Sequence, residues 1–251
     1  MIISFEFDGI LYSSDLKKGR DISIPLISDA TGPKCFYAPN FKVEPVVAGD
    51  FIGSVAAGSP VNFKNIFINP HGNGTHTECV GHISADLYTI HECLKEFHYV
   101  TRLVTLTPEV LPNGDQIITE QLLIGLLEGN VGTEVVVIRT IPNDEKKMTA
   151  DYSGKNPPYF TKEAIQYLHN IGVHHLVTDL PSIDREEDGG RLEGHKTFWG
   201  YPDQITDYKT ITEMVYVPND IEDGLYFCNI QIASIMSDAS PSKVVLYKMN
   251  R

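Results

Sequence analysis

Short runs of apolar residues, many of them β-branched, recur along the chain and are separated by residues that favour turns. Runs of this length and composition predict largely buried β-strands. A turn signal, Pro112-Asn113-Gly114, follows the second of these runs. The predicted strands are residues 65–69, 99–106, 134–140, 174–179, 225–234 and 243–249.

Two segments have features of helices instead. Residues 120–128 follow Thr119, a favourable N-cap, and they end at Gly129. Residues 162–170 follow Thr161, carry an apolar stripe on one face, and end shortly before a glycine. Both segments are therefore predicted to be helices.

The order of these elements predicts the fold class. Strands outnumber helices and the two kinds are mixed, which is typical of α/β or α+β proteins with a mixed, strand-rich sheet. No internal repeat or low-complexity linker interrupts the chain. We therefore expect a single domain that spans residues 1–251.

Length and charge narrow the possible partners. The chain has 251 residues and a mass of 28.0 kDa, which is enough to bury a full hydrophobic core. Its 33 acidic and 20 basic residues give a net charge of −13, which disfavours nucleic-acid or anionic-membrane binding. No run approaches the roughly 18 apolar residues of a membrane helix, and no signal peptide is apparent. We expect a cytoplasmic protein with a small-molecule substrate.

The four cysteines form no C-x-x-C pair and have no tight, even spacing, so a zinc ribbon or a disulfide framework is not expected. Reduced thiols follow from that expectation. The cysteines are Cys35, Cys79, Cys93 and Cys228.

The strongest chemical signal is a histidine-rich segment that follows the first predicted strand. His71, His76 and His82 fall within twelve residues, and Glu78 lies two residues after His76. In an extended segment these two side chains point to the same side and can hold one ion. Glycines at 72 and 74 let the chain turn so that His71 approaches the same point. Imidazole and carboxylate ligands without a thiolate pair suit zinc or manganese.

Other interpretations of these residue types were weighed against a metal site. A single histidine in a loop is usually solvated or paired with a neighbouring polar group, and we expect this for His91, His98, His169, His174 and His175. Cys79 lies within the histidine-rich segment, but its side chain should point away from that of Glu78, so we expect it to pack as a small hydrophobe.

The segment from Gly74 to His82 resembles the signature of the cyclase-like metal-dependent hydrolases, whose motif is His-x-Gly-Thr-His-x-Asp-x-Pro-x-His. This family includes the bacterial kynurenine formamidases and the isatin hydrolases. Three further parts of the chain resemble the family in the same order: Asp-Ile-Ser-Ile-Pro-Leu from Asp21, Thr-Asp-Leu-Pro-Ser-Ile-Asp ending at Asp184, and the positions of His195 and Glu213.

The resemblance implies a swivelling β/β/α fold, a homo-oligomer (dimer or tetramer), and one or two divalent ions, with zinc preferred to manganese. His71, His76 and Glu78 would hold the first ion, and Glu78 would bridge to a second ion. The second ion would be held by His195 and Glu213, which are also metal ligands by this resemblance. His82 matches the catalytic acid/base histidine, which would exchange a proton with the attacking water and the leaving amine.

The sequence also departs from the family motif. Glu78 replaces an aspartate, Val80 replaces a proline, and one extra residue separates His71 from the Gly-Thr-His core. The segment after His195 lacks the helical signature that is usual in the family. Bridging by Glu78, the number of ions and the substrate therefore stay open.

The leading functional hypothesis is a metal-dependent hydrolase that cleaves a C–N bond in a small amide, formamide or cyclic amide. The alternatives are a non-catalytic metal- or ligand-binding relative and a hydrolase of lactones or cyclic esters. No G-x-S-x-G elbow or Walker A pattern supports a serine hydrolase or a P-loop NTPase.

Several residues beyond the expected ligands have more than one possible role. Asp179 and Asp184 match family positions close to the site, where a structural role or a substrate contact is possible. Phe198, Trp199 and Tyr201 would line an aromatic substrate pocket, or else pack in the core or at an interface.

Overall fold

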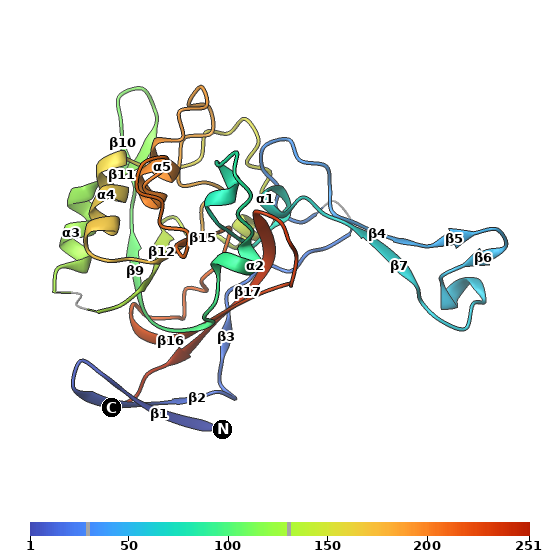
Figure 1. Cartoon of the computed structure of the whole chain (residues 1–251), viewed down its shortest axis with the longest axis horizontal. Helices are drawn as coiled ribbons and strands as arrows, with labels where there is room; N and C mark the ends of the chain where they lie inside the picture. Colours follow the sequence, from blue (N-terminus) through green and yellow to red (C-terminus); the bar gives the residue numbers. More distant parts are fainter. Residues whose placement is uncertain (29–30, 130–131) are drawn as a thin grey trace.

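A closed β-barrel forms the centre of the molecule (Figure 1). The structure is a computed structural model that describes residues 1–28, 31–129 and 132–251. Seven strands run around the barrel in the order β16, β9, β12, β14, β15, β8 and β17, and β17 pairs back to β16. Neighbours from β9 to β15 are parallel, and the other pairs are antiparallel. The strands are β8 His76–Glu78, β9 His98–Leu106, β12 Val135–Thr140, β14 His175–Thr178, β15 Thr210–Glu213, β16 Gly224–Ile232 and β17 Ala239–Lys248.

The parallel strands are apolar because both of their faces are covered. Every residue of β12 is buried, and its side chains alternate between two hydrophobic clusters. Val136 and Ile138 pack with residues of the helices, whereas Val135 and Val137 pack with residues of β16 and β17. The continuous apolar run at 134–140 thus reflects a strand between two packed layers.

Three helices cover one side of the barrel. They are α3 Glu120–Leu127, α4 Lys162–Asn170 and α5 Glu193–Trp199, and α4 contacts both of the others. Thr119 and Thr161 accept hydrogen bonds from backbone N–H groups of the first turns of α3 and α4. The two helices predicted from the sequence are therefore confirmed with their caps.

All six predicted strands are present with shifted ends, the first as β7 Lys64–Phe67. The sequence did not predict β8, β15 or α5, nor a hairpin of β1 Ile2–Phe7 and β2 Ile10–Asp15. The smaller elements are β3 Arg20–Asp21, α1 Pro70–Asn73, α2 Ile90–Cys93, β10 Glu109–Val110, β11 Gln116–Ile118, β13 Tyr159–Phe160 and 3₁₀ turns at Val55–Ala57, Val80–His82 and Glu145–Thr149.

An arm of residues 42–67 projects away from the barrel (Figure 1). It consists of two antiparallel ribbons, β4 Lys42–Pro45 with β7, and β5 Val47–Ala48 with β6 Phe51–Ile52. Neither ribbon joins the barrel sheet. Across the described ranges, no helix has the length and hydropathy needed to cross a membrane.

The packing of α4 onto the barrel gives a stability prediction. Replacing the fully buried Leu168 in Leu168→Ala should lower the free energy of unfolding by about 2–5 kcal/mol, because it leaves a cavity in the core. The matched change Leu126→Ala, at a side chain on α3 that is 39% exposed, should cost about 0.5 kcal/mol or less. Urea unfolding followed by the fluorescence of Trp199, the single tryptophan, measures both. Equal losses in the two variants would contradict this packing.

Candidate metal centre

Strand β8 lies between β15 and β17 and brings together side chains that are far apart in the sequence. Glu213 of β15 is directly opposite His76, and Ala239 of β17 is directly opposite Glu78. Because His76 and Glu78 are two positions apart on one strand, they project from the same face, as the spacing predicted. Three neighbouring strands therefore supply the centre of the site.

Threonines on both sides of His76 fix the position of β8. The hydroxyl of Thr75 accepts a hydrogen bond from the N–H of Ile24 at 2.9 Å and donates to the carbonyl of Met214. The hydroxyls of Thr77 and Thr212 are 2.8 Å apart across the β8–β15 pair. The Gly-Thr-His-Thr sequence thus anchors the strand through buried hydroxyls, which satisfies its polar groups away from water.

His71 reaches the site from α1. Asn69 caps this short helix by accepting a hydrogen bond from the N–H of Gly72 at 3.0 Å, and Pro70 occupies its first position. The His71 ring lies with Nδ1 3.0 Å from Glu78 Oε2. The turn predicted to return His71 towards His76 and Glu78 is therefore a capped helical turn.

His195 reaches the site from α5. Its Nε2 is 3.1 Å from Glu78 Oε1, and its Nδ1 is 2.6 Å from Asp184 Oδ2. Asp184 also accepts hydrogen bonds from the N–H groups of Gly194 and His195. A Cβ atom at Gly194 would lie 2.8 Å from Asp184 Oδ1, so a glycine is needed for this close approach. Asp184 fixes the orientation of the His195 ring, in the manner of carboxylates behind metal-binding histidines.

Glu78 is the centre of the arrangement. Its carboxylate is buried and lies 3.0 Å from His71, 3.1 Å from His195 and 3.9 Å from His82. Burial alone would raise the pKa of Glu78, but the charge on His82 and hydrogen bonds from His195 and His71 hold it well below its usual value. The carboxylate is therefore ionised and needs positive charge around it.

The histidines at its two oxygens supply this charge when the site holds no metal. Burial lowers the pKa of His71, but hydrogen bonds to Asp238 and Glu78 outweigh it and raise this pKa to about 10. Burial also lowers the pKa of His195, but hydrogen bonds to Asp184 and Glu78 outweigh this effect and raise the pKa to about 10. The protons on these two histidines thus supply the positive charge beside Glu78 that a bound metal ion would otherwise supply.

The imidazole of His76 shows the clearest sign of a missing ligand. It is completely buried, and its Nδ1 lies 3.0 Å from the carbonyl of Gly74, which fixes the proton on Nδ1. In the neutral ring Nε2 then presents a lone pair, and this atom has no hydrogen-bond partner among the described residues. The nearest carboxylate oxygen, Glu213 Oε2, is 3.5 Å away. A buried acceptor without a donor is costly unless it binds a cation.

The donor atoms fit a divalent ion. Three groups of ligand atoms lie within 4.8 Å of one another: His71 with His76 and Glu78, Glu78 with His82 and His195, and His71 with His82 and Asp238. All are imidazole nitrogens or carboxylate oxygens, a set that suits zinc or manganese. The site is therefore suited to hold a metal, and the chemistry of its donor set matches the prediction from the sequence.

The six residues predicted from the sequence come together here: His71, His76, Glu78, His82, His195 and Glu213. His82 lies at the edge, with 31% of its side chain exposed, and its Nδ1 is 3.6 Å from Asp238 Oδ2. Asp238 was not predicted. It contacts His71 Nε2 at 2.8 Å, and hydrogen bonds with His71 and His82 lower its pKa. Its only sequence signal is its position just before a predicted strand, which is too common to single it out.

Helix α5 corrects one expectation. The segment after His195 departs from the helical signature that is usual in the family, yet it forms α5. Asp184 accepts hydrogen bonds from N–H groups at the start of this helix, and Phe198 and Trp199 are completely buried at its end. These two aromatic residues pack in the core rather than line a substrate pocket or an interface. The ring centroids of Trp199 and His195 lie 5.5 Å apart, so the indole packs against the imidazole.

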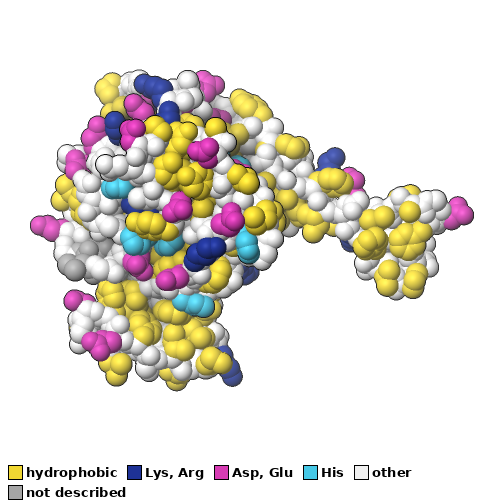
Figure 2. Space-filling model, viewed as in Figure 1, with side chains coloured by type: hydrophobic (Ala, Val, Ile, Leu, Met, Phe, Trp, Pro, Cys, Tyr) yellow, Lys and Arg dark blue, Asp and Glu magenta, His cyan; other side chains and the backbone are white. Residues whose placement is uncertain are grey.

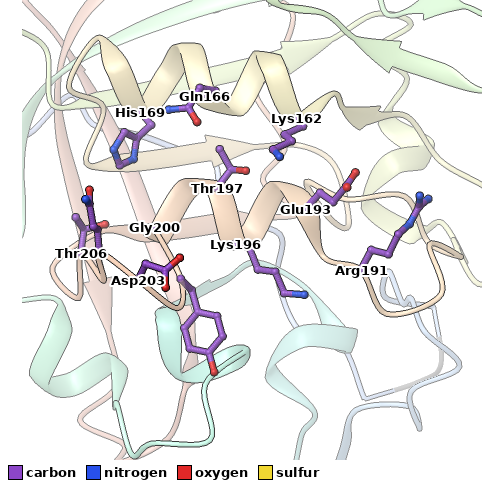
Figure 3. Close-up of a pocket in the computed structure, with 12 residues that line it drawn as sticks. Lys162, Gln166, His169, Arg191, Glu193, Lys196, Thr197, Gly200, Asp203 and Thr206 are labelled. Atoms are coloured by element: carbon purple, nitrogen blue, oxygen red, sulfur yellow. The ribbon is translucent and has the colours of Figure 1, made fainter.

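Two large hollows in the described part of the molecule are candidates for a substrate path. One has a volume of about 830 Å³, lies between α4 and α5, and includes Lys162, Arg191 and Lys196 in its lining, but no predicted ligand (Figure 3). The other has a volume of about 670 Å³ and runs from the root of the arm to His71, past Ile66 and Phe67. Only the second reaches a predicted metal ligand and is therefore the better candidate for a substrate path.

The model of the Cyclase family, described as "Putative cyclase", matches residues 20–185, which is more than half of the chain. The chain belongs to the Cyclase family. The match includes His71, His76, Glu78 and His82. The Cyclase-family relationship predicted from the sequence is therefore confirmed.

Solved structures share the Cyclase-family fold. A predicted metal-dependent hydrolase from Bacillus stearothermophilus is 20% identical and aligns over 92% of this chain and 98% of its own, with a TM-score of 0.64. A potential metal-dependent hydrolase with cyclase activity is 18% identical, over 93% and 99%, with a TM-score of 0.67. An isatin hydrolase bound to the product analogue thioisatinate is 13% identical, over 93% of both chains, with a TM-score of 0.61. A search of the curated proteins found no match.

The contact between Asp184 and His195 gives a prediction about metal binding. Asp184→Asn removes the charge that orients and polarises His195, so metal affinity should fall about 10- to 100-fold while the fold is retained. The matched control Glu187→Gln removes an exposed carboxylate from the same segment and should bind metal like the unchanged chain. Titration with Zn²⁺ against a competing chelator measures both. Equal affinities of the two variants would refute a role for Asp184 behind the metal ligand.

Proposed function

We propose that this Cyclase-family protein is a metal-dependent hydrolase that cleaves a carbon–nitrogen bond in a small amide, formamide or cyclic amide. The observation that carries the proposal is the buried Nε2 of His76, which faces the site without a hydrogen-bond partner among the described residues. Ionised Glu78 beside it supplies the negative charge that a divalent cation needs. Solved metal-dependent hydrolases with the same fold support the coarser assignment.

His71, His76 and Glu78 would hold one ion, and His195 with Glu213 would hold a second that shares Glu78. We favour Zn²⁺ over Mn²⁺, since three of these five ligands are imidazoles. When bound, the metal supplies the Lewis acidity that polarises a carbonyl group and makes water nucleophilic at neutral pH.

His82 is the residue that we assign to proton transfer. Its ring is partly exposed at the edge of the buried ligands, and its Nε2 lies 3.9 Å from Glu78 Oε2. Asp238 lies 3.6 Å from the other ring nitrogen and holds negative charge close to it. A histidine in this position takes a proton from water and returns it to the leaving nitrogen.

The groove beside His71 supports a substrate with an apolar part. Ile66 and Phe67 line it together with Pro39 and Pro70, so a flat, apolar ring fits its chemistry. Isatin hydrolases share the fold, and isatin is a cyclic amide of this kind. We extend this substrate class, the cyclic amides, to this chain, but not isatin itself. Separately, we expect the protein to be located in the cytoplasm.

The decisive experiment combines metal analysis with a substrate panel. Purified protein should contain zinc or manganese, and it should hydrolyse at least one member of a panel of aryl formamides, cyclic amides and lactones. Removal of metal by a chelator should abolish turnover, and added Zn²⁺ or Mn²⁺ should restore it. Metal without turnover on any compound would favour a non-catalytic binding protein, and turnover of lactones alone would favour a C–O hydrolase.

Replacing His82 separates chemistry from metal binding. His82→Asn should retain the metal but lower kcat about 10²- to 10⁴-fold, because it removes the group that transfers the proton. His91→Asn, at an exposed histidine elsewhere in the chain, is the matched control and should leave kcat unchanged. Metal content and steady-state kinetics on the best panel substrate measure the effect. Unchanged kcat in His82→Asn would remove His82 from the mechanism.

A further inference from the structure

Three cationic side chains line the hollow of about 830 Å³ between α4 and α5 (Figure 3). Lys162 comes from α4, Lys196 from α5, and Arg191 from the segment just before α5. The chain as a whole carries a charge of −13. The face shown in Figure 2 has acidic side chains spread over the body of the molecule, with fewer basic ones among them. Three cations around one hollow therefore depart from the overall charge balance.

These three cations lack carboxylate partners. Within the described residues, Lys162, Arg191 and Lys196 form no ion pair, whereas Lys147 in the core forms one of 2.8 Å. Arg191 is nevertheless held in place, because its Nε donates a hydrogen bond to the carbonyl of Asp188 at 2.9 Å. The positive charge at the hollow is therefore available to a ligand.

A fourth cation contacts the wall of the hollow. Lys209 is only 3% exposed, and its Nζ lies 3.1 Å from Nδ1 of His169, a residue that lines the hollow. The ring of Phe198 lies beside it, with its centroid 5.2 Å from Nζ. Burial lowers the pKa of Lys209 to about 8, and no carboxylate of the described residues pairs with it. A buried ammonium group without a counter-ion is stabilised by an anion nearby.

Two carboxylates also line the hollow, those of Glu193 and Asp203. Against the three cations they leave an excess of one positive charge. Thr197 and Tyr201 add hydroxyl groups to the lining. Carboxylates accept hydrogen bonds but repel anions, so this lining suits a ligand that carries hydroxyl groups in addition to negative charge.

Charge and size define the class of ligand. A phosphate group, which carries nearly two negative charges at neutral pH, matches several cations at once, and arginine binds its oxygens through two parallel N–H donors. The hollow of about 830 Å³ is in the range of pockets that hold whole organic molecules, so it is far larger than one phosphate group requires. The remaining space suits an organic part whose hydroxyl groups reach the carboxylates.

The hollow is distinct from the metal centre but borders a helix that contributes to it. Its described lining includes no predicted metal ligand. A smaller hollow of about 400 Å³ shares Lys162, Arg191 and Glu193 with it and extends to Asp184, whose carboxylate orients His195. A ligand between α4 and α5 therefore contacts the helix that carries His195 without contacting a metal ligand.

We propose that the hollow between α4 and α5 is a second binding site, for a small phosphate ester whose organic part carries hydroxyl groups. The three unpaired cations bind the phosphate oxygens, and buried Lys209 adds its charge next to His169. The two carboxylates accept hydrogen bonds from the hydroxyl groups. Sugar phosphates and nucleotides share this chemistry. The proposal stands independently of the reaction at the metal centre, because it involves none of the metal ligands.

Isothermal titration calorimetry of the full chain tests the ligand class. The probes are adenosine monophosphate for a nucleotide and ribose 5-phosphate for a sugar phosphate. At least one of them should bind at one molecule per chain with a Kd below about 1 mM. Adenosine, ribose and inorganic phosphate should each bind at least about tenfold more weakly than this ester, because each lacks one part of the ligand. Binding of neither ester, or equally tight binding of inorganic phosphate, would overturn the proposal.

Removing two cations tests the location. The double variant Arg191→Gln, Lys196→Gln should weaken binding of the tighter ester at least about tenfold, and Lys162→Gln on the facing helix should weaken it as well. The matched control Lys17→Gln, Lys18→Gln removes the same charge from an exposed segment after β2 and should bind like the unchanged chain. Circular dichroism checks that each variant is folded. Equal affinities of the hollow variants and the control would exclude this site.

Hydrogen exchange with the tighter ester at saturating concentration maps the contact. Backbone amides of residues 162–170 and 191–200 should exchange at least about twofold more slowly when the ester is bound, because it holds α4 and α5 together. Amides of the β1–β2 hairpin should exchange at the same rate with and without it. Protection of residues 71–82 instead would place the ester at the metal centre and contradict a second site.

Discussion

An ionised carboxylate buried in the wall of a β-barrel is the constraint on which the rest of this structure depends. Glu78 is 1% exposed, and within the described residues it forms ion pairs with histidines but with no lysine or arginine. Removing such a charge from water costs several kcal/mol unless cations or hydrogen bonds compensate. Protonated histidines and a metal ion can both compensate, but a proton and the metal compete for the same nitrogen lone pair. The centre is therefore a place where the fold itself requires a cation.

This requirement explains which elements could be predicted from the sequence. Strands such as β12 and helix α4 are defined by burial of apolar side chains, and their period is visible in the sequence. Strands β8 and β15 are equally buried but consist largely of Thr, His and Glu, because their side chains form the site or hydrogen-bond across it. Because of this polar composition, the sequence pattern did not predict either strand. Helix α5 was not predicted either, since the N–H groups of its first turn bond to Asp184, which lies outside the helix.

The residues of the metal centre also differ in whether the sequence could predict them. His76 and Glu78 were predicted from their spacing alone, because residues two positions apart on one strand share a face. His195 and Glu213 were predicted only through the family resemblance, since their approach depends on the register of β15 against β8 and on the packing of α5. Asp238 had no usable signal. It reaches His71 because the first residues of β17 pair with β8, with Ala239 opposite Glu78, a tertiary contact that no local pattern encodes.

Two departures from the family motif lie on either side of the Gly-Thr-His core. Glu78 is one methylene longer than the aspartate of the motif, and the link from His71 to the Gly-Thr-His core is one residue longer. In this structure the link begins in the helical turn that Asn69 caps, and His71 Nδ1 lies 3.0 Å from Glu78 Oε2. The other oxygen, Oε1, faces His195 at 3.1 Å. Each oxygen of the longer carboxylate thus meets a different histidine, which is the arrangement that a carboxylate shared between two cations requires.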